Sequence, residues 1–426
     1  MNARVAAAEL LIAVLDRGCT LDDALTETPS FSALEGRDRA FARTLVTAGL
    51  RRLGRVNAVL SAFLERPLPE SAQHARALLH IGATQLLVLG TPPHAAVGET
   101  VEAANALRQA RGFAKLINAV LRRVAREGAA MFAALPPGSD LPVWLYARWR
   151  ASYGEAAAQM AQALWREPPL DLTAKSDAKA WTQKLGGKLT PTESVRLPLP
   201  LRGGGVETLD GFAAGAWWVQ DAAAALPARA LGDVRGKRVL DLCAAPGGKT
   251  LQLATMGAHV TAIDKSETRL TRLRDNLART KFSAEVICAD ALEYRAGEAF
   301  DAVLLDAPCS STGTLRRHPE VAWLRRPNDI RALSELQSRL LRAAAAHLKP
   351  GAPVVYAVCS LEQEEGPGVV AQALNAGWRR QPIEAGHIAG ADEFRTPDGD
   401  LRTLPSHWPE IGGLDGFYIA RLQRLS

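Results

Sequence analysis

A glycine-rich turn at residues 241–250 reads Asp-Leu-Cys-Ala-Ala-Pro-Gly-Gly-Lys-Thr and joins a short apolar run to a helical segment. Small residues in such a turn let a ligand approach the backbone closely. The turn lacks the spacing of a dinucleotide-binding motif, and Cys243 occupies the position where a phosphate-binding loop needs its first glycine. It therefore favours a nucleoside without phosphates as the ligand.

Two aspartates follow the next two apolar runs. Asp264 lies 16 residues beyond Gly248, close to the spacing of about 20 residues at which a carboxylate accepts the ribose hydroxyls in nucleotide-binding sheets. Asp290 follows the third run. One acid at the end of a strand is commonly the N-cap of a helix. A glycine-rich turn and two acids at three strand ends together predict recognition of adenosine.

Two cysteines follow the last two apolar runs, Cys309 in Asp306-Ala307-Pro308-Cys309 and Cys359 in Val358-Cys359-Ser360. Adjacent parallel strands lie about 4.8 Å apart, so these thiols converge on one substrate if the two strands are neighbours. A single cysteine after a strand is more often a small buried hydrophobic residue. Two thiols beside Asp306, opposite a predicted adenosine site, indicate nucleophilic chemistry instead.

The elements that carry these residues alternate between strand and helix. Short apolar runs occupy residues 238–242, 259–263, 284–288, 302–305 and 353–358, with helical segments between them. This alternation predicts an α/β doubly wound, Rossmann-like sheet, with ligands bound outside the carboxyl ends of its strands. We assign residues 216–426 to this catalytic domain.

Residues 1–128 are predicted to form an all-α domain, because apolar residues recur at helical spacing over 5–15, 41–53, 75–89 and 97–124. This part carries 16 Lys and Arg against 12 Asp and Glu. Its basic clusters are either solvated helix faces or contacts to RNA. The clusters are Arg37/Arg39/Arg43, Arg51/Arg52/Arg55 and Arg108/Arg111/Lys115/Arg122/Arg123. Residues 129–215 are predicted to be a linker and a small α+β module.

Length and composition limit the possible classes of protein. The 426 residues suggest two to four domains, and 47% hydrophobic with 23% charged residues exclude wholesale disorder. Of the 51 basic residues ten are lysine and 41 are arginine, which hints at nucleic acid or at a GC-rich genome. The five cysteines form no CxxC pair, so neither a metal site nor a disulfide framework is predicted. No apolar run is long enough for a membrane segment, and we expect a cytoplasmic protein.

At this point the motifs resemble those of a known family. The stretches Leu-Asp-Leu-Cys-Ala-Ala-Pro-Gly-Gly-Lys-Thr (240–250), Leu-Leu-Asp-Ala-Pro-Cys-Ser (304–310) and Tyr-Ala-Val-Cys-Ser (356–360) are similar to the S-adenosylmethionine-dependent RNA cytosine-C5 methyltransferases. The N-terminal part resembles the NusB-like domain of the bacterial RsmB-type enzymes. The resemblance implies methylation of C5 of a specific cytosine in 16S ribosomal RNA, free or in an early small-subunit particle, with no obligate protein partner.

The resemblance also implies roles for single residues. Cys359 is the nucleophile that adds to C6 of cytosine, and Cys309 is the base that releases the C5 proton. Asp306 serves both N3 of the base and the cofactor, Asp264 binds the ribose hydroxyls and Asp290 the adenine amine. The turn that lines the methionine and ribose comprises Cys243, Ala244, Ala245, Pro246, Gly247, Gly248 and Lys249.

The sequence departs from the family pattern in the segment before the catalytic domain. The family tends to have Asn-Pro-Pro-Leu-x-Leu-Arg-x-Asn, whereas residues 167–175 read Glu-Pro-Pro-Leu-Asp-Leu-Thr-Ala-Lys. The arginine and the final asparagine are missing, which weakens the case for RNA handling by the intermediate module.

Other functions stay open at this stage. One is cytosine-C5 methylation of transfer RNA or another RNA, and another is a non-catalytic RNA-binding factor. A DNA cytosine methyltransferase would use the cysteine of its Pro-Cys pair as nucleophile and would need no second thiol. An amino-group methyltransferase would carry Asp/Asn-Pro-Pro-aromatic in place of residues 306–309, which the sequence lacks.

Overall fold

The computed structural model describes residues 2–199, 201 and 204–425. The chain divides into two compact units. The first combines Met1–Arg166 with Leu315–Arg326, and the second combines Glu167–Thr314 with Pro327–Ser426. The predicted boundary at residue 128 lies inside the first unit, and the one at residue 215 lies inside the second.

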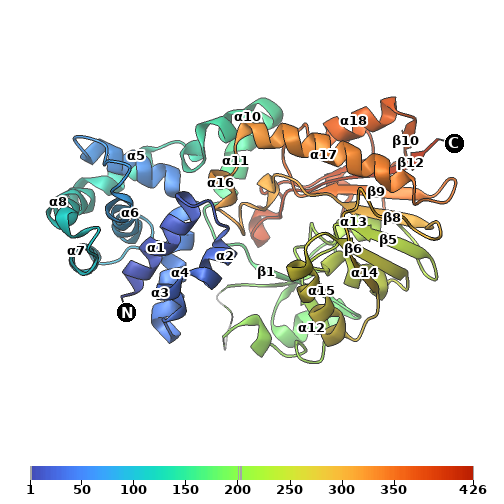
Figure 1. The fold of residues 1–426 in the computed structure, drawn as a ribbon, viewed down its shortest axis with the longest axis horizontal. Coiled ribbons are helices and arrows are strands. Elements are labelled where there is room, and N and C mark those ends of the chain that lie inside the picture. Colours follow the sequence, from blue (N-terminus) through green and yellow to red (C-terminus); the bar gives the residue numbers. More distant parts are fainter. Residues whose placement is uncertain (1, 200, 202–203, 426) are drawn as a thin grey trace. The chain divides into compact units, whose positions relative to one another are not determined.

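The first unit is built of helices, as predicted (Figure 1). The helix α6 is buried along most of its length and contacts α1, α4, α5, α7 and α8. Asn2 caps α1 by accepting the backbone N–H of Arg4, and Pro93 begins α7, where a missing N–H costs nothing. The α-helices of this unit are α1 Ala3–Leu15, α2 Leu21–Glu27, α3 Pro29–Ser32, α4 Gly36–Arg51, α5 Leu53–Phe63, α6 Gln73–Leu87, α7 Pro93–Ala106, α8 Ala114–Arg123, α9 Ala129–Ala134, α10 Val143–Tyr153, α11 Ala156–Ala163 and α16 Val321–Leu324.

A buried ion cluster ties α5 to the chain beyond residue 128. The Asp140 carboxylate lies 3.0 Å from Arg55 Nε and 3.1 Å from Arg52 Nε, and it accepts a hydrogen bond from Trp165 Nε1 at 2.7 Å. Arg55 also donates to the carbonyls of Phe132 and Pro136. Because these groups are buried, the cluster holds residues 129–166 to the N-terminal helices.

Arg51, Arg52 and Arg55 therefore do not form an exposed basic cluster. Their side chains are buried, and Arg51 Nη1 donates to the carbonyls of Leu164 (3.1 Å) and Arg316 (2.7 Å). The expectation of a solvated or RNA-binding face at these three arginines is wrong. Other segments of the same unit supply the acceptors for these guanidinium groups: the Asp140 carboxylate and the carbonyls of Leu164 and Arg316.

Residues 315–326 leave the predicted catalytic domain and pack in the first unit. Besides the Arg316 carbonyl bond to Arg51, Trp323 and Leu324 of α16 pack against the core of the N-terminal helices. This segment begins six residues after Cys309. The motif around Cys309 does not predict that the chain leaves the domain here, because the contacts that hold the segment are far away in the sequence, with Arg51 265 residues from Arg316.

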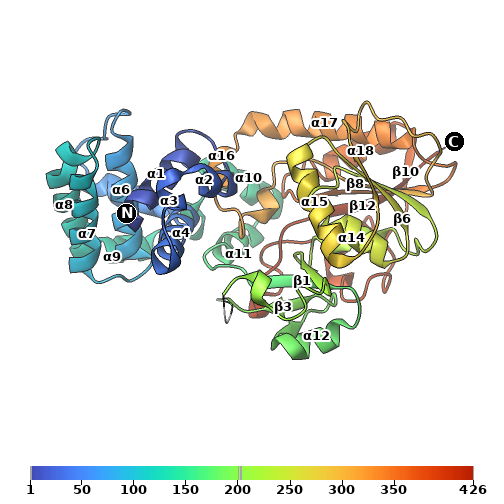
Figure 2. The ribbon, with the colours of Figure 1, turned by 60° about the horizontal axis from the view of Figure 1, so that its bottom comes forward.

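The second unit contains a small antiparallel sheet with the order β2-β3-β1-β4 (Figure 2). Its core is formed by Leu172, Val195, Leu197 and Trp217. The helix α12 packs against this core through Trp181 and other apolar side chains. The elements are β1 Leu170–Ala174, α12 Ala178–Leu185, β2 Lys188–Leu189, β3 Val195–Leu197 and β4 Trp217–Val219. This is the small α+β module predicted between the other parts.

The larger sheet has the order β10-β12-β9-β8-β5-β6-β7. Strands β7, β6, β5, β8 and β9 are parallel, and β12 runs antiparallel beside β9. The strands are β5 Arg238–Leu242, β6 His259–Asp264, β7 Glu285–Cys288, β8 Ala302–Asp306, β9 Pro353–Val358, β10 Trp378–Arg380, β11 Leu401–Arg402, which pairs with β12, and β12 Tyr418–Arg424. The order confirms the predicted doubly wound, Rossmann-like fold.

Helices cover both faces of this sheet, because alternate residues of each buried strand point to opposite sides. On one face Val239 and Leu304 pack with Leu226 of α13. On the other face Leu240 and Val303 pack with Leu340 of α17 and with residues of α18. Figures 1 and 2 show α17 and α18 side by side. The helices are α13 Leu226–Ala230, α14 Gly248–Thr255, α15 Glu267–Thr280, α17 Pro327–Ala345 and α18 Pro367–Asn375.

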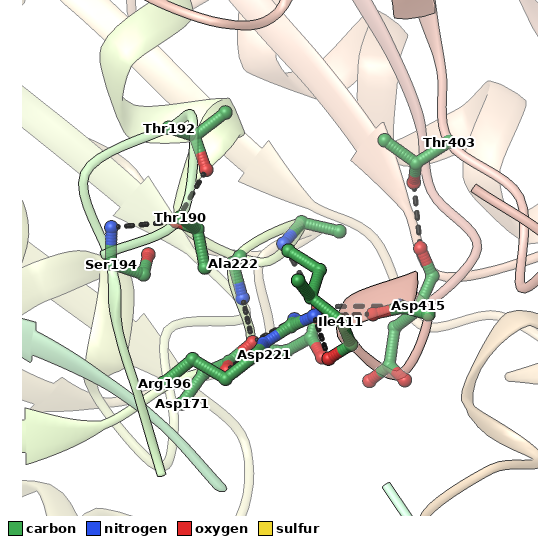
Figure 3. Close-up of polar contacts among 12 residues, drawn as sticks. Asp171, Thr190, Thr192, Ser194, Arg196, Asp221, Ala222, Thr403, Ile411 and Asp415 are labelled. Atoms are coloured by element: carbon green, nitrogen blue, oxygen red, sulfur yellow. Dashed lines mark hydrogen bonds and ion pairs between the residues drawn. The ribbon is translucent and has the colours of Figure 1, made fainter. Parts of the chain in front are cut away.

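A buried Asp–Arg pair joins the small sheet to the loop before β12 (Figure 3). Asp171 on β1 accepts two hydrogen bonds from Arg196 on β3, at 2.7 and 2.6 Å. Arg196 Nη1 donates to the carbonyls of Ile411 (3.2 Å) and Gly413 (2.9 Å). The backbone N–H of Asp415, two residues beyond Gly413, donates to the carboxylate of Asp221 at 3.3 Å. The small sheet therefore fixes residues 411–413 through Arg196, and Asp221 holds Asp415.

We predict that Asp140→Asn strongly destabilises the first unit, because it leaves two buried guanidinium groups without their counter-charge. Breaking a buried ion pair by removing one partner costs about 3 to 5 kcal/mol. The matched control is Asp16→Asn, whose pair with Arg76 is partly exposed (2.6 Å) and should cost no more than about 1 kcal/mol. The free energy of unfolding of both variants is measured by a short protease pulse at a series of denaturant concentrations. Fragments of the two units are then quantified separately. Equal shifts for the two variants would contradict the assigned role.

Candidate active site

The predicted site residues lie at the carboxyl ends of the parallel strands. Strand β5 has β6 on one side and β8 on the other, and the chain visits β6 and β7 before it returns to β8. The strand order therefore reverses between β5 and β8. Ligands of open α/β sheets bind at such a reversal, outside the carboxyl ends of the strands.

The glycine-rich turn follows β5 and has an unusual backbone. Cys243 has φ +63° and Gly247 has φ +103°, and the Ala245–Pro246 peptide bond is cis. A Cβ on Gly247 would meet Leu273 Cγ at 2.8 Å, so only glycine fits both the backbone conformation and the packing. The turn leads directly into α14, which begins at Gly248.

Asp264, at the end of β6, contacts this turn. Its Oδ2 atom accepts the backbone N–H of Ala245 (3.2 Å) and lies 3.2 Å from Arg269 Nη1. Its Oδ1 atom accepts the N–H of Ser266 (3.0 Å). An ionised carboxylate has about four acceptor positions, so Asp264 can shape the turn and still accept a further hydroxyl.

Asp290 is exposed beyond β7, and its Oδ1 atom accepts the N–H of Leu292 at 2.8 Å. No helix follows Asp290 in the structure, so this contact belongs to a turn at residues 291–293 and is not the helix N-cap of the alternative interpretation. A contact to adenine uses different acceptor positions of the same carboxylate and stays a prediction.

Asp241, the next-to-last residue of strand β5, was not singled out from the sequence. It is fully buried, and its Oδ2 atom accepts a hydrogen bond from Thr250 Oγ1 (2.6 Å). Its Oδ1 atom has no hydrogen-bond partner within the part of the chain that the structure describes. Burial raises the pKa of Asp241 to about 7, against the lowering effect of the Thr250 bond. A buried acceptor without a partner behind the glycine-rich turn fits a polar ligand there.

Lys249 and Asp306 form an ion pair across the strand reversal, with Nζ and Oδ2 2.7 Å apart. Burial acts to lower the pKa of Lys249, but the charge and hydrogen bond of Asp306 outweigh it and the pKa is raised. Lys249 is therefore an ammonium, and it lies 5.2 Å from the ring centre of Phe417. From the sequence we expected Lys249 only as part of the turn; its side-chain pairing was missed, because the two residues are 57 positions apart.

The two cysteines meet at the ends of β8 and β9, which are parallel neighbours. Cys309 Sγ and Cys359 Sγ lie 3.4 Å apart. Cys309 is buried and Cys359 is partly exposed. The third cysteine of the site, Cys243, is a poor nucleophile, because burial raises its pKa to about 12. The structure thus brings together one pair of thiols beside the Lys249–Asp306 ion pair.

The surroundings of the two thiols differ. The hydrogen bond from Cys309 lowers the pKa of Cys359, against the opposing effects of burial and of Asp306, and Lys249 acts in the same lowering direction. The same bond raises the pKa of Cys309, together with burial and the charges of Cys359 and Glu365. The bond between the thiols therefore favours the thiolate on Cys359, and Lys249 and Glu365 act in the same direction.

Close backbone contacts fix the position of Cys359. The N–H of Gly313 donates to the Cys359 carbonyl (3.0 Å), and the N–H of Gly416 donates to the Gly313 carbonyl (2.8 Å). A Cβ on Gly313 would lie 1.9 Å from the Gly416 carbonyl oxygen, so no other residue fits. Because Gly416 follows the loop held by Arg196, the small sheet contributes to the geometry of the thiol pair.

The doubly wound sheet with an antiparallel β12, a glycine-rich turn after β5 and acids at the following strand ends define a Rossmann-like methyltransferase domain. Comparison with known proteins supports this class. Residues 228–423 match the family of 16S rRNA methyltransferases RsmB/F, and residues 1–126 match the NusB family.

Full-length relatives are similar along the whole chain. The ribosomal RNA small subunit methyltransferase B of Vibrio cholerae is 39% identical over 443 residues, which cover 100% of this chain and 98% of that protein. The protein of the same name from Xanthomonas campestris is 39% identical over 446 residues, covering 100% and 97%. The chain belongs to this family of S-adenosylmethionine-dependent methyltransferases.

Solved structures have the same fold. The crystal structure of PH0851 has a TM-score of 0.76 at 21% identity and covers 100% of this chain and 99% of that one. A methyltransferase homologue from Pyrococcus horikoshii has a TM-score of 0.54 at 26% identity and covers 66% and 94%. Within the described residues no helix is long and apolar enough to cross a membrane.

We predict that iodoacetamide modifies Cys359 at lower pH than Cys309, because the thiolate is the reactive form and the pKa of Cys359 is lowered while that of Cys309 is raised. Peptide mapping of the alkylated protein across pH 6 to 9.5 gives a rate for each cysteine. Lys249→Met should move the Cys359 profile to higher pH, since it removes a neighbouring cation. Faster modification of Cys309 at every pH would reverse the assignment.

Proposed function

We propose that this protein transfers a methyl group from S-adenosylmethionine to C5 of a cytosine in 16S ribosomal RNA through a covalent bond between a cysteine and C6. The observation that carries this proposal is the pair of thiols 3.4 Å apart at the ends of β8 and β9, beside the Lys249–Asp306 ion pair. Cytosine C5 is a poor nucleophile, and a thiolate added at C6 makes it enamine-like.

The cofactor would be held by the turn 243–249 and by Asp264, with Asp290 reaching the adenine. The unpartnered buried oxygen of Asp241 and the close backbone of the turn support a polar ligand at this place. When bound, S-adenosylmethionine supplies an electrophilic methyl group. Asp306 Oδ2 is engaged by Lys249, which leaves further acceptor positions of this carboxylate for the methionine ammonium.

Cys359 is the nucleophile of the proposed reaction. Its thiolate forms a bond to C6, and the electron pair of the C5–C6 double bond becomes available at C5 for the methyl group. Negative charge that develops on the ring needs a proton or hydrogen bond at N3. In the proposed reaction Asp306 supplies it, after taking a proton from the Lys249 ammonium to which it is hydrogen-bonded.

Cys309 is the base that restores the aromatic ring. Its hydrogen bond to Cys359 and the charge of Cys359 are among the causes that raise its pKa. Both disappear once Cys359 is a thioether at C6, so Cys309 can then ionise, and its proton replaces the one that the Lys249–Asp306 pair gave to N3. The Cys309 thiolate accepts the C5 proton, the C5–C6 double bond re-forms and the bond from Cys359 to C6 breaks. The N3 proton leaves to solvent as the one proton released overall, and the Cys359 thiolate is restored.

The choice of RNA rests on the family. The relatives named above act, by their names, on small-subunit ribosomal RNA, and we propose the same substrate here, free or in an early particle. Exposed basic residues of the first unit, Arg37, Arg39, Arg43, Arg108, Arg111, Lys115, Arg122 and Arg123, are available for phosphate contacts. Transfer RNA remains the alternative substrate, and a non-catalytic RNA-binding role the alternative function.

We predict that Asp264→Ala weakens binding of S-adenosylmethionine by roughly 5- to 150-fold, because the loss of a polar partner in a buried site costs about 1 to 3 kcal/mol. Calorimetry measures the affinity. Asp275→Ala, which alters an exposed acid of α15, is the control and should bind normally. Wild-type affinity in Asp264→Ala would show that the cofactor is held elsewhere.

We predict that the two cysteine variants fail differently. Cys359→Ser should abolish turnover and adduct, because a hydroxyl is far harder to ionise than a thiol. Cys309→Ser should attack and methylate once, then stall with RNA attached. A denaturing gel with 16S RNA, with small-subunit particles and with transfer RNA in parallel shows an RNase-sensitive slow band for Cys309→Ser in the arm that contains the substrate.

An adduct in Cys359→Ser and none in Cys309→Ser would exchange the two roles and indicate the single-cysteine mechanism of DNA methyltransferases. Near-normal turnover of Cys309→Ser without a trapped band would mean that Cys309 only packs. Absence of methyl transfer by the wild type in every arm would favour the non-catalytic RNA-binding role.

A further inference from the structure

A single buried carboxylate connects the two loops that carry the cysteines. Ser310 follows Cys309, Ser360 follows Cys359, and both serines bond to Glu365. The Ser310 N–H donates to Glu365 Oε1 (2.8 Å), and the Ser360 hydroxyl donates to Oε2 (2.5 Å). The Ser310 hydroxyl also donates to Oε2. Glu365 is fully buried.

Further contacts hold Glu365 from two other elements. Gln337 on α17 donates through Nε2 to Glu365 Oε1 (2.9 Å) and to the Pro308 carbonyl (2.9 Å). Tyr356 on β9 donates through its hydroxyl to the Glu365 carbonyl (2.5 Å). Gln337 thus contacts both the carboxylate and the residue before Cys309.

The donors to this carboxylate are all neutral. Burial of a carboxylate away from water is expensive, and neutral hydrogen bonds offset the cost only when they are complete and well aligned. Movement of either cysteine loop away from Glu365 would break at least one of these bonds. The carboxylate therefore resists separation of the two loops more strongly than an apolar contact would.

We propose that Glu365 is a positioning residue that fixes the Cys309 loop against the Cys359 loop and so keeps the two thiols at the spacing that the reaction needs. Its importance for the reaction rests on the proposed function, whereas its effect on the spacing of the thiols does not. Glu365 acts through Ser310 and Ser360, each directly bonded in sequence to one of the cysteines.

The charge of Glu365 has a second effect in the same direction. It is one of the causes that raise the pKa of Cys309, after the hydrogen bond with Cys359, burial and the charge of Cys359. Lys249 lies on the other side and lowers the pKa of Cys359. The group that fixes the spacing thus also helps to retain the proton on Cys309.

The spacing can be measured without RNA or cofactor, using phenylarsine oxide. This reagent forms two As–S bonds with two nearby thiols and releases one water, so that its oxygen leaves with the two thiol protons. Peptide mapping after iodoacetamide identifies which cysteines are protected. We expect protection of Cys309 and Cys359 in the full-length wild type, and an apparent affinity at least about tenfold weaker in Glu365→Gln, the size expected for loss of a bond to a charged group.

Turnover is measured on the same preparations. Glu365→Gln should lower kcat by about tenfold or more, while its KM for RNA and its affinity for S-adenosylmethionine stay within about twofold of wild type. Glu335→Gln is the matched control, since Glu335 is an exposed glutamate of α17 paired with Arg331, and it should behave as wild type. If Glu365→Gln does not fold, Ser360→Ala, which removes one of the bonds to the carboxylate, should change both readouts in the same direction.

Wild-type arsenical affinity in a folded Glu365→Gln protein would overturn the proposal. So would a weakened affinity with unchanged kcat, since the spacing would then not matter for the reaction. A wild-type protein that binds the arsenical through Cys309 and Cys359 but methylates no RNA would refute the proposed function and leave the effect of Glu365 on thiol spacing measurable.

Discussion

Parallel pairing of β8 with β9, next to β5, is the constraint on which the site depends. Each parallel strand delivers its carboxyl end to the same edge of the sheet, so residues 50 positions apart in sequence become neighbours. The pairing brings the loops of the two thiols, which lie 3.4 Å apart, to one edge of the sheet, and the Lys249–Asp306 ion pair lies beside them. Because the strand order reverses between β5 and β8, the glycine-rich turn opens onto the same point. The glycine-rich turn and the two thiols thus lie on three separate segments, after β5, β8 and β9.

Electrostatics then distinguishes two chemically identical side chains. Lys249 lies on the Cys359 side of the pair, and Glu365 lies on the Cys309 side. Together with the hydrogen bond between the thiols, these charges favour retention of the proton on Cys309 and the thiolate on Cys359. Lys249 lies on α14, whereas Glu365 lies between β9 and α18. The proposed reaction needs one nucleophile and one proton acceptor. Two identical thiols can take these two roles because the groups around them differ.

The backbone around the thiols is held by parts of the chain that carry no chemistry. Arg196 and Asp171 fix the loop 411–413, and through Gly416 and Gly313 that loop contacts the Cys359 carbonyl. The small sheet is therefore a support for the catalytic domain. Residues 315–326 continue from the Cys309 loop into the first unit, where Arg51 holds the Arg316 carbonyl. The chain itself thereby links the reactive loop to the N-terminal helices.

The sequence by itself determined the helical N-terminal part, the doubly wound sheet and the strand ends at Asp264, Asp306, Cys309 and Cys359, because periodicity and short motifs are local properties of the chain. Only the tertiary structure decided which charges meet. In the sequence Arg51, Arg52 and Arg55 look like a surface cluster, yet in the structure they are buried. Asp140 and the carbonyls of distant residues are their partners. Nor could the sequence predict the side-chain partner of Lys249 or the contacts of Glu365. A buried charge is tolerated only where distant segments supply its partners, and such pairing leaves no local pattern from which it could be predicted.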